Sequence, residues 1–239
     1  MNTQTLVLKR NAHGPFLITN NKVYSNVSGV NTQEGMGIDA DDLSGPATIA
    51  RNEVFSNQGN GIQVFYGESV SIFSNLSYLN TRTGIYIYAC STCAVSGNDS
   101  WGNGDLGLYD GGLVSVGVTA YNNILAYNTT RGGSVTNGTA AAAGFGSGGN
   151  VTFANVNNNG CANLTCPYTA DPLTRAKSNT PTSKEDFKLR PDSPYKCSGS
   201  TAVGRMQDKL GRFYEPNCTP VGAYMYGGGD AAPARSAAP

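Results

Sequence analysis

A cluster of acidic residues between positions 34 and 42 is the part of the chain best equipped for chemistry. It comprises Glu34, Asp39, Asp41 and Asp42. Carboxylate oxygens are the ligands that calcium prefers, so the cluster predicts a calcium site. As an alternative, the Cα atoms of Asp39 and Asp41 would lie about 6.5 to 7 Å apart on one face of a strand. This separation is compatible with general acid and general base catalysis across a glycosidic bond. An ordinary solvated turn after a strand is the third interpretation.

Two columns of residues stand in register with Asp39 and Asp41 when the chain is aligned on its repeats. The first column reads Asp39, Gln63, Tyr86 and Tyr109, and the second reads Asp41, Phe65, Tyr88 and Gly111. Aromatic rings stack on pyranose faces, and carboxylates bind hydroxyl groups or a cation. The columns therefore predict an outward-facing strip that binds a polysaccharide, acidic at one end and aromatic along the rest. Its candidate substrate-binding residues are Gln63, Phe65, Tyr88 and Tyr109.

A lyase or C5-epimerase that acts on a uronate polymer needs a base for the C5 proton and a cation for the adjacent carboxylate. Tyrosines on the strip are candidate bases, and Arg82 could clamp the carboxylate. The candidate catalytic residues are Asp39, Asp41, Tyr86 and Arg82. Exposed tyrosines also stabilise a coil as stacking ladders, and a corner arginine also fits an ordinary surface position, so structural roles stay open.

The residues of the strip are positioned by a pattern that is written three times between Ala47 and Gly111, at a spacing of 23 residues. Each copy has an Asn, a second Asn five residues later, and a Gly-Ile or Gly-Leu pair four residues further on. The copies carry Asn52, Asn57 and Gly61-Ile62, then Asn75, Asn80 and Gly84-Ile85, then Asn98, Asn103 and Gly107-Leu108. Short apolar runs of period two at this repeat length predict a parallel β-helix. At each bend an Asn amide can bond the backbone and the same amide one rung away.

The ladder extends beyond the three regular copies. Earlier and later rungs carry Asn21 with Asn26 and Asn123 with Asn128. In the earlier rung the Gly-Ile pair follows the second Asn by 11 residues instead of four, which indicates a seven-residue insertion within Val27 to Met36. The insertion supplies Glu34 and could form one side of the binding strip, as active-site loops often do.

From Pro167 the ladder gives way to charged and proline-rich sequence. Three distinctive segments follow, namely Asp171-Pro172-Leu173, Asp186 to Pro194, and Val221 to Tyr226. Together with the Asn and Gly-Ile rungs, they resemble the closing segment and coils of bacterial right-handed parallel β-helix proteins of the pectate-lyase-like superfold. The likeness covers roughly Phe16 to Tyr226.

The resemblance implies an all-β fold, a right-handed parallel β-helix of about six to seven rungs over residues 1–166. Residues 167–226 would form an irregular closing segment of the same domain, and residues 227–239, rich in Ala, Pro and Gly, a disordered tail. The superfold hosts lyases, hydrolases, epimerases and non-catalytic surface proteins, so it implies no single function.

Signature segments of two enzyme groups of this superfold are absent. The Gly-His-Gly segment of polygalacturonases does not occur, and neither does the Tyr-Gly-x-Asp-Pro-His segment of alginate epimerases. No catalytic residue is therefore carried over from them. The expected function is a lyase or C5-epimerase acting on an acidic polysaccharide. The alternatives are a non-catalytic carbohydrate-binding or surface-structural protein, and a glycoside hydrolase that uses Asp39 and Asp41.

Charge and hydropathy exclude several classes of partner. The chain has 16 Lys and Arg against 16 Asp and Glu, so nothing predicts a surface for nucleic acid or for an anionic membrane. No apolar run approaches the ~18 residues of a membrane span. Residues 1–11 lack the apolar region of a signal peptide, and we expect a natural leader or N-terminal cap to be missing from this sequence.

Six cysteines predict disulfides and an oxidising compartment. Among the possible connectivities, proximity favours Cys90–Cys93, Cys161–Cys166 and Cys197–Cys218. A redox Cys-x-x-Cys lacks its βαβ context, and His13, the sole histidine, supplies no zinc pattern. Four of the eight Asn-x-Ser/Thr sites fall in ladder positions, where a glycan would block stacking. A bacterial protein that is secreted, periplasmic or on the cell surface is therefore expected.

Overall fold

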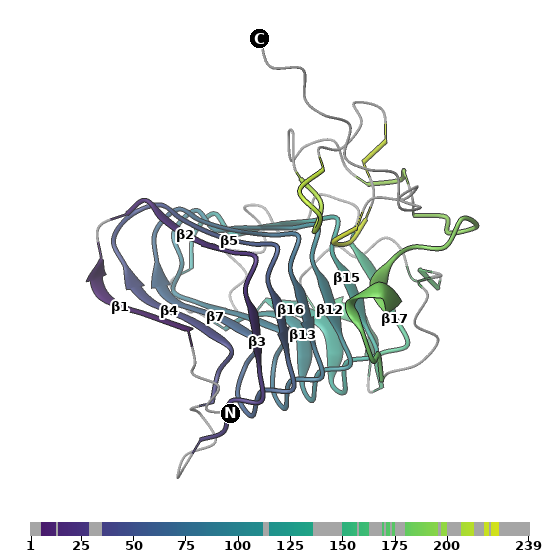
Figure 1. The fold of residues 1–239 in the computed structure, drawn as a ribbon, viewed down its shortest axis with the longest axis horizontal. Coiled ribbons are helices and arrows are strands. Elements are labelled where there is room, and N and C mark those ends of the chain that lie inside the picture. The colour runs from purple at the N-terminus through teal and green to yellow at the C-terminus, as the bar shows by residue number, and fades with distance from the viewer. Residues whose placement is uncertain are drawn as a thin grey trace.

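The computed structural model is a coil of short parallel strands (Figure 1). It describes residues 6–12, 14–28, 35–111, 115–135, 150–156, 158–162, 169, 171–172, 174, 180–195, 197–199, 207–212, 218–219 and 221–224. Each regular turn of the coil contributes one strand to each of three parallel sheets. This architecture confirms the prediction of an all-β, right-handed parallel β-helix.

The three sheets run side by side along the coil. The first sheet contains, in order, β1 (Leu6–Ala12), β4 (Ile38–Leu43), β7 (Ile62–Gly67), β10 (Ile85–Tyr88), β13 (Leu106–Asp110), β16 (Arg131–Val135) and β18 (Asn158–Ala162). The second contains β2 (Phe16–Thr19), β5 (Ala47–Ala50), β8 (Val70–Phe73), β11 (Ala94–Ser96) and β14 (Thr119–Tyr121). The third contains β3 (Lys22–Tyr24), β6 (Glu53–Phe55), β9 (Leu76–Tyr78), β12 (Asp99–Trp101), β15 (Ile124–Ala126) and β17 (Val151–Phe153).

Five successive turns contribute a strand to all three sheets. In the part of the chain that the structure describes, the next turn adds β16 and β17, and β18 follows alone. The regular coil is therefore slightly shorter than the six to seven rungs predicted.

Equivalent residues of successive repeats pair across the first sheet. Ile62 pairs with Ile38 on one side and with Ile85 on the other, and Ile85 pairs with Leu108. All four side chains are buried in the core of the coil. Because side chains alternate along a strand, the positions between them face outward. The predicted register of the outward columns is thereby confirmed.

Two rows of asparagine side chains run along the corners of the coil. The Nδ2 of Asn52 donates to Oδ1 of Asn75 at 3.0 Å, and the backbone N–H of Asn52 donates to the same oxygen at 2.9 Å. The amide-to-amide bond recurs along Asn21, Asn52, Asn75, Asn98, Asn123 and Asn150 in one row, and along Asn57, Asn80, Asn103, Asn128 and Asn155 in the other. The predicted ladder is confirmed and continues one rung further, to Asn150 and Asn155.

The corners require an unusual backbone. Among the described residues, the one before each ladder asparagine has a positive φ, for example Arg51 at 58°, Ser74 at 54° and Leu79 at 54°. Residues other than glycine rarely adopt this conformation, because the Cβ crowds the backbone. The hydrogen bonds of the ladder therefore outweigh the local preference at every turn.

The described parts of the closing segment cover the outer face of the third sheet. Phe187, in the 3-10 turn η1 (Lys184–Phe187), packs against Tyr78 and Trp101 with ring centroids 4.9 and 5.9 Å away. Figure 1 shows the green parts of the chain beside β15 and β17. A second apolar core results, formed by Leu76, Tyr78, Trp101, Ile124, Ala126, Val151, Phe187, Leu189, Tyr195, Val221, Ala223 and Tyr224.

Two predicted disulfides are confirmed. Cys90 and Cys93 are bonded with a Cα separation of 5.9 Å, and Cys197 and Cys218 with one of 4.3 Å. The first pair lies in the core of the coil, and the second ties two parts of the closing segment together. Several other predictions concern positions outside the described residues, namely Glu34, His13, Cys166 and the tail 227–239.

Candidate functional site

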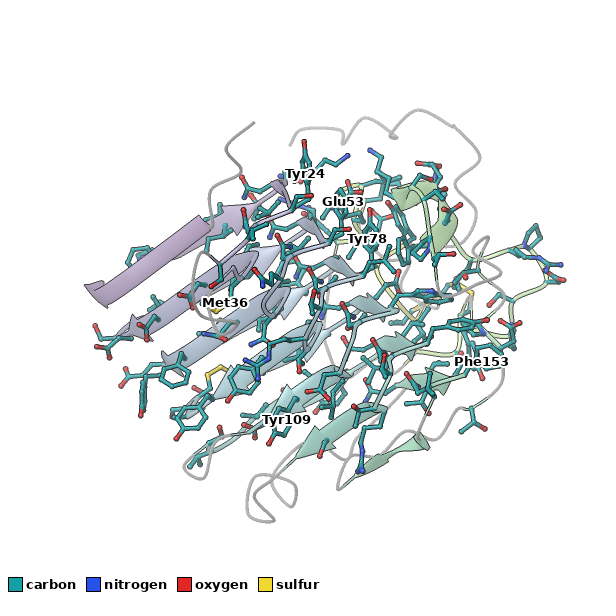
Figure 2. The ribbon with its side chains drawn as sticks, turned by 90° about the horizontal axis from the view of Figure 1, so that it is seen from below. Tyr24, Met36, Glu53, Tyr78, Tyr109 and Phe153 are labelled. Atoms are coloured by element: carbon teal, nitrogen blue, oxygen red, sulfur yellow. A yellow bond between two sulfur atoms is a disulfide. The ribbon has the colours of Figure 1, made fainter. Side chains whose placement is uncertain are left out.

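A groove of about 220 Å³ opens on the outer face of the first sheet, over β7, β10 and β13. In Figure 2, Tyr109 on this sheet lies apart from Glu53 and Tyr78 of the third sheet. The groove is lined by Asn60, Gln63, Phe65, Arg82, Thr83, Tyr86, Asp105 and Tyr109. Five of these, namely Gln63, Phe65, Arg82, Tyr86 and Tyr109, are residues that the sequence predicts for the site. The structure thus gathers much of the predicted strip in one place.

Aromatic rings stack along the strip. Phe65 and Tyr88 lie face to face, with ring centroids 4.5 Å apart and planes inclined by 9°. Tyr86 and Tyr109 are tilted, with centroids 5.5 Å apart. Gly111 leaves room for this second pair, because a Cβ there would stand 3.0 Å from Cε1 of Tyr109. The rings form a continuous apolar surface beside the polar groups of the groove.

Tyr66 belongs to the same aromatic surface, although strict alternation along β7 would place it inside the coil. Its φ is 56°, which turns the end of the strand. Its ring meets Phe65 and Tyr88 edge on, with centroids 4.8 and 5.6 Å away. The side chain is 48% exposed. Tyr66 therefore extends the aromatic surface, and the period-two pattern that predicts the strip gives no sign of it.

A chain of side-chain hydrogen bonds runs along the polar side of the strip. The backbone N–H of Thr83 donates to Oδ1 of Asn60 at 3.1 Å, and Nδ2 of Asn60 donates to Oε1 of Gln63 at 2.8 Å. Nε2 of Gln63 in turn donates to Oδ1 of Asp39 at 3.2 Å. These bonds fix the amide of Gln63 in one orientation. Asp39 is the last acceptor in this series of hydrogen bonds, and its side chain is only 6% exposed.

Tyr86 and Arg82 are the best candidates for chemistry in the groove. Arg82 is exposed in the corner before β10, and Tyr86 is half-buried on that strand. Burial, together with the neighbouring Tyr109 and Tyr88, raises the pKa of Tyr86, and the positive charge of Arg82 partly opposes the rise. The Tyr86 phenol is therefore neutral near pH 7 and can donate a hydrogen bond.

Three residues of the acidic cluster, namely Asp39, Asp41 and Asp42, lie in the described part of the chain. Asp41 faces outward beside Phe65, whereas Asp42 has a φ of 58° at the end of β4. No group of three His, Cys, Asp or Glu side chains that could hold a metal ion occurs in the described ranges. Calcium binding here stays a prediction, which would need Glu34 from outside these ranges to supply a further ligand.

Three residues of the groove were missed by the alignment of columns, namely Asn60, Thr83 and Asp105. Asn60 and Thr83 occupy the same position of successive repeats, one residue before Gly61 and Gly84. Both residues stand three positions before the first column of the strip, so the 23-residue period also relates them to each other. Asp105 lies 23 residues after Arg82, at the same position of the next repeat, and its backbone N–H donates to the carbonyl oxygen of Arg82 at 3.3 Å.

Parallel sheets, asparagine ladders and a lateral groove define a right-handed parallel β-helix protein. The family model described as "Right handed beta helix region" matches residues 5–170, and the chain belongs to this family. No curated protein and no solved structure matches the chain. Within the described residues, no helix has the length and apolar character needed to cross a membrane. Family membership thus establishes the fold, and the function has to be argued from the groove.

Proposed function

We propose that the protein binds an acidic polysaccharide along the groove and acts on it as a lyase or C5-epimerase. The observation that carries the proposal is that aromatic rings and an exposed arginine share one open groove. The ring pairs offer faces on which pyranose rings stack. The planar guanidinium of Arg82 offers two parallel N–H donors to the carboxylate of a uronate.

The reaction would begin at the C5 proton of the uronate held by Arg82. Pairing with Arg82 stabilises the negative charge that develops on the carboxylate as this proton leaves. Tyr86 would take the C5 proton in its phenolate form, whose share grows as the pH rises toward the raised pKa of this phenol. In elimination, the electron pair of the C5–H bond forms the C4–C5 double bond as the C4–O bond breaks, and the leaving oxygen takes the proton from Tyr86. In epimerisation, C5 instead receives a proton from water on its opposite face, and Tyr86 loses its proton to solvent.

Incubation with alginate, pectate and glycosaminoglycans tests the proposal. Ultraviolet absorbance reports the new double bond, and NMR of the polymer reports inversion at C5. We expect Tyr86→Phe to abolish product while polymer binding persists, and Arg82→Gln to weaken both. Parallel reactions with EDTA show whether calcium takes part. A protein that binds one of these polymers but neither cleaves nor epimerises it would overturn the catalytic part of the proposal.

Non-catalytic carbohydrate binding is the second candidate. It is favoured by the raised pKa of Tyr86, which keeps the phenol protonated in the free protein. Affinity electrophoresis through gels that contain each polymer separates this function from the first. Retarded migration without any product would support a binding module. Unchanged migration in every gel would overturn both candidates.

Glycoside hydrolysis by Asp39 and Asp41 has less support. Asp39 is buried against Gln63, and neither aspartate lines the groove. Hydrolysis would give new reducing ends without ultraviolet absorbance, and Asp39→Asn would abolish them. The same polymer panel therefore covers this alternative.

We further propose that the protein works in an oxidising compartment, either secreted, periplasmic or on the cell surface. The two disulfides support this location, because glutathione and thioredoxin keep most cytosolic thiols reduced. Mass spectrometry after alkylation without reductant, on protein taken from each cell fraction, checks both the location and the bonds.

A further inference from the structure

A second cavity, of about 290 Å³, lies between the corners near β3 and β6 and the closing segment. It shares no lining residue with the groove on the first sheet. The residues that matter for its chemistry are Lys22, Arg51, Glu53, Lys184, Lys209 and Tyr224. Residues far apart in the sequence thus line one cavity.

The charge of this cavity is strongly positive. Four of its lining residues are cationic, and Glu53 is the one carboxylate among them. Glu53 is 8% exposed, and its Oε1 accepts a hydrogen bond from the Tyr78 hydroxyl at 2.8 Å. Figure 2 shows Glu53 and Tyr78 on neighbouring strands. One carboxylate against four cationic side chains leaves an excess of positive charge in the cavity.

Two residues that line the cavity each carry a buried hydrogen-bond donor without a partner in the described structure. One is the hydroxyl of Tyr224, a residue only 1% exposed, and the other is Nε of Arg51. The Arg51 guanidinium is held in place, because its Nη1 donates to Oε1 of Gln207. Leaving a buried donor unsatisfied is costly, so such groups in a native protein usually have a ligand, ion or water to bind.

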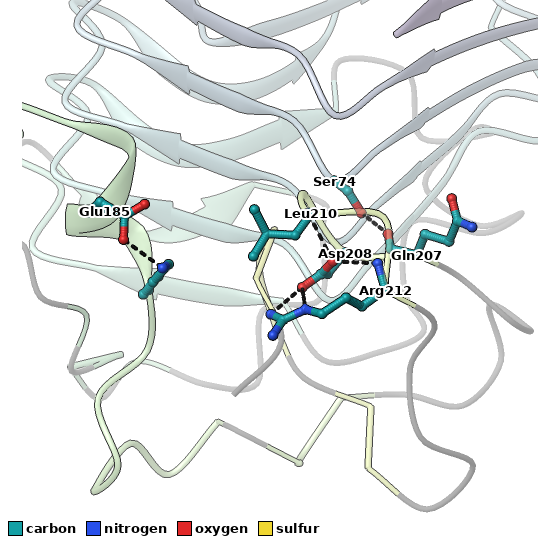
Figure 3. Close-up of polar contacts among 7 residues, drawn as sticks. Ser74, Glu185, Gln207, Asp208, Leu210 and Arg212 are labelled. Atoms are coloured by element: carbon teal, nitrogen blue, oxygen red, sulfur yellow. Dashed lines mark hydrogen bonds and ion pairs between the residues drawn. The ribbon is translucent and has the colours of Figure 1, made fainter. Parts of the chain in front are cut away.

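The loop 207–212 places Lys209 at the cavity, and this loop is built around the buried carboxylate of Asp208 (Figure 3). Oδ1 of Asp208 accepts from the backbone N–H groups of Leu210 and Arg212, both at 2.9 Å. Oδ2 accepts from Nε and Nη2 of Arg212 at 2.9 and 2.6 Å. Nζ of Lys209 donates to the carbonyl oxygen of Arg51. An ammonium group has three N–H donors, so it can also bind a ligand.

We propose that this cavity binds a tetrahedral oxyanion, a sulfate or phosphate group, either free or as an ester on a sugar. Such a group accepts several hydrogen bonds from different directions, which matches the donors of Arg51, Tyr224 and Lys209. Lys184 adds positive charge at the exposed side. The site is independent of the groove, so it stands whether or not the groove acts on a polymer.

Calorimetric titration tests the site with three probes, namely inorganic sulfate, inorganic phosphate and a monosaccharide sulfate. Ionic strength is kept constant with chloride in every titration. We expect saturable binding of at least one probe. Equal affinity for the inorganic ion and the ester would identify the free ion as sufficient, and preference for the ester would identify a sugar-borne group.

Two variants tie binding to the cavity. Tyr224→Phe should lower affinity roughly 10-fold without loss of thermal stability in ligand-free protein, because the hydroxyl has no partner to lose. Lys184→Gln should also weaken binding. Lys188→Gln is the matched control, since Lys188 lies near the same turn but pairs with Glu185 at 2.6 Å and does not line the cavity.

The pH dependence gives a further readout. Burial lowers the pKa of Lys209 to about 8, Glu53 opposes this shift, and Lys184 and Arg51 add to it. Lys22 and Tyr224 are the other titratable groups that line the cavity. Binding should weaken as the pH rises past about 8 and Lys209 loses its charge. Absence of saturable binding with all three probes, or unchanged affinity in both Tyr224→Phe and Lys184→Gln, would overturn the proposal.

Discussion

The carboxyl group of Asp99 on the third sheet lies directly against Gly222 of the closing segment. A Cβ added to Gly222 would stand 2.4 Å from Oδ1 of Asp99 and 2.7 Å from Cδ1 of Ile124. The backbone N–H of Gly222 donates to the carbonyl oxygen of Asn122 at 2.7 Å. The closing segment can make this bond only because residue 222 has no side chain.

Replacement of Gly222 by alanine should detach this part of the closing segment. The φ of Gly222 is +90°, and the new Cβ would collide with Asp99, so we expect a loss of at least about 3 kcal/mol in the free energy of unfolding. Urea unfolding measures it. Gly211→Ala is the control, because Gly211 has a similar φ of +79° but its nearest neighbour would lie 3.7 Å away. That variant should lose only about 1 kcal/mol, and equal losses would contradict the role of the collision.

Asp99 should make the protein less stable as the pH rises. Burial raises its pKa well above the usual value of 3.8, and the nearby amide of Ala223 only partly opposes the rise. Apart from this amide, neither carboxyl oxygen has a hydrogen-bond partner in the described structure. Because the folded-state pKa is the higher one, the stabilising contribution of the neutral acid is complete below pH 3.8 and is lost as the pH rises through the folded value.

The Asp99→Asn variant isolates this effect. The melting temperatures of the variant and of the unmodified protein are measured as a function of pH. The melting temperature of the variant should rise relative to that of the unmodified protein as the pH increases from about 4. The slope of this difference is the readout, since the new amide group can shift the variant's curve by a constant amount. A difference that does not change with pH would show that Asp99 is charged in the folded state at no cost.

Removal of an amide from the middle of a ladder should be costly. Asn75→Ala leaves the backbone N–H and Nδ2 of Asn52 without their acceptor and removes the bond to the carbonyl of Ile49. We expect a loss of about 3 kcal/mol in the free energy of unfolding. At the half-buried Asn21, which begins the described row, alanine should cost about 1 kcal/mol. Chemical denaturation of both variants checks the ranking, and a larger loss at Asn21 would contradict it.

Tyr66 should contribute to polysaccharide binding and little to folding. Its ring meets Phe65 and Tyr88 edge on while 48% of the side chain is exposed. Tyr66→Ala should weaken binding of the polymer that the groove takes by about 5-fold and change stability by less than about 1 kcal/mol. Leu17→Ala, at an exposed apolar residue of β2, is the control for nonspecific effects. Equal retardation of both variants in affinity gels would place Tyr66 outside the site.

The coil could be predicted from the sequence because its contacts join equivalent positions of successive repeats. Asn52 bonds Asn75, and Ile62 pairs with Ile85, so the residues in contact are those separated by one repeat of 23 residues. The two columns of the strip follow from the same register, since side chains alternate along each strand. Four lining residues of the groove, namely Gln63, Phe65, Tyr86 and Tyr109, stand in these columns.

Contacts that do not repeat could not be predicted in this way. Phe187 meets Trp101 across a long stretch of chain, and no period relates the two. The positive φ of Tyr66 reverses the direction that alternation assigns to its side chain. The burial of Asp39 depends on a bond from Gln63, whose own orientation is set by Asn60. Each of these features requires the three-dimensional arrangement.

All amides of a ladder donate in the same direction, from Asn52 to Asn75 and from Asn75 to Asn98. Each turn therefore offers the preceding turn the same acceptor that it finds in the following one, and turns are interchangeable units. A chain with an additional copy of the 23-residue unit would satisfy every amide along the enlarged row. The outward columns would grow with it by one interstrand spacing, about 4.8 Å per turn. The number of turns therefore sets the length of polymer that the surface can span.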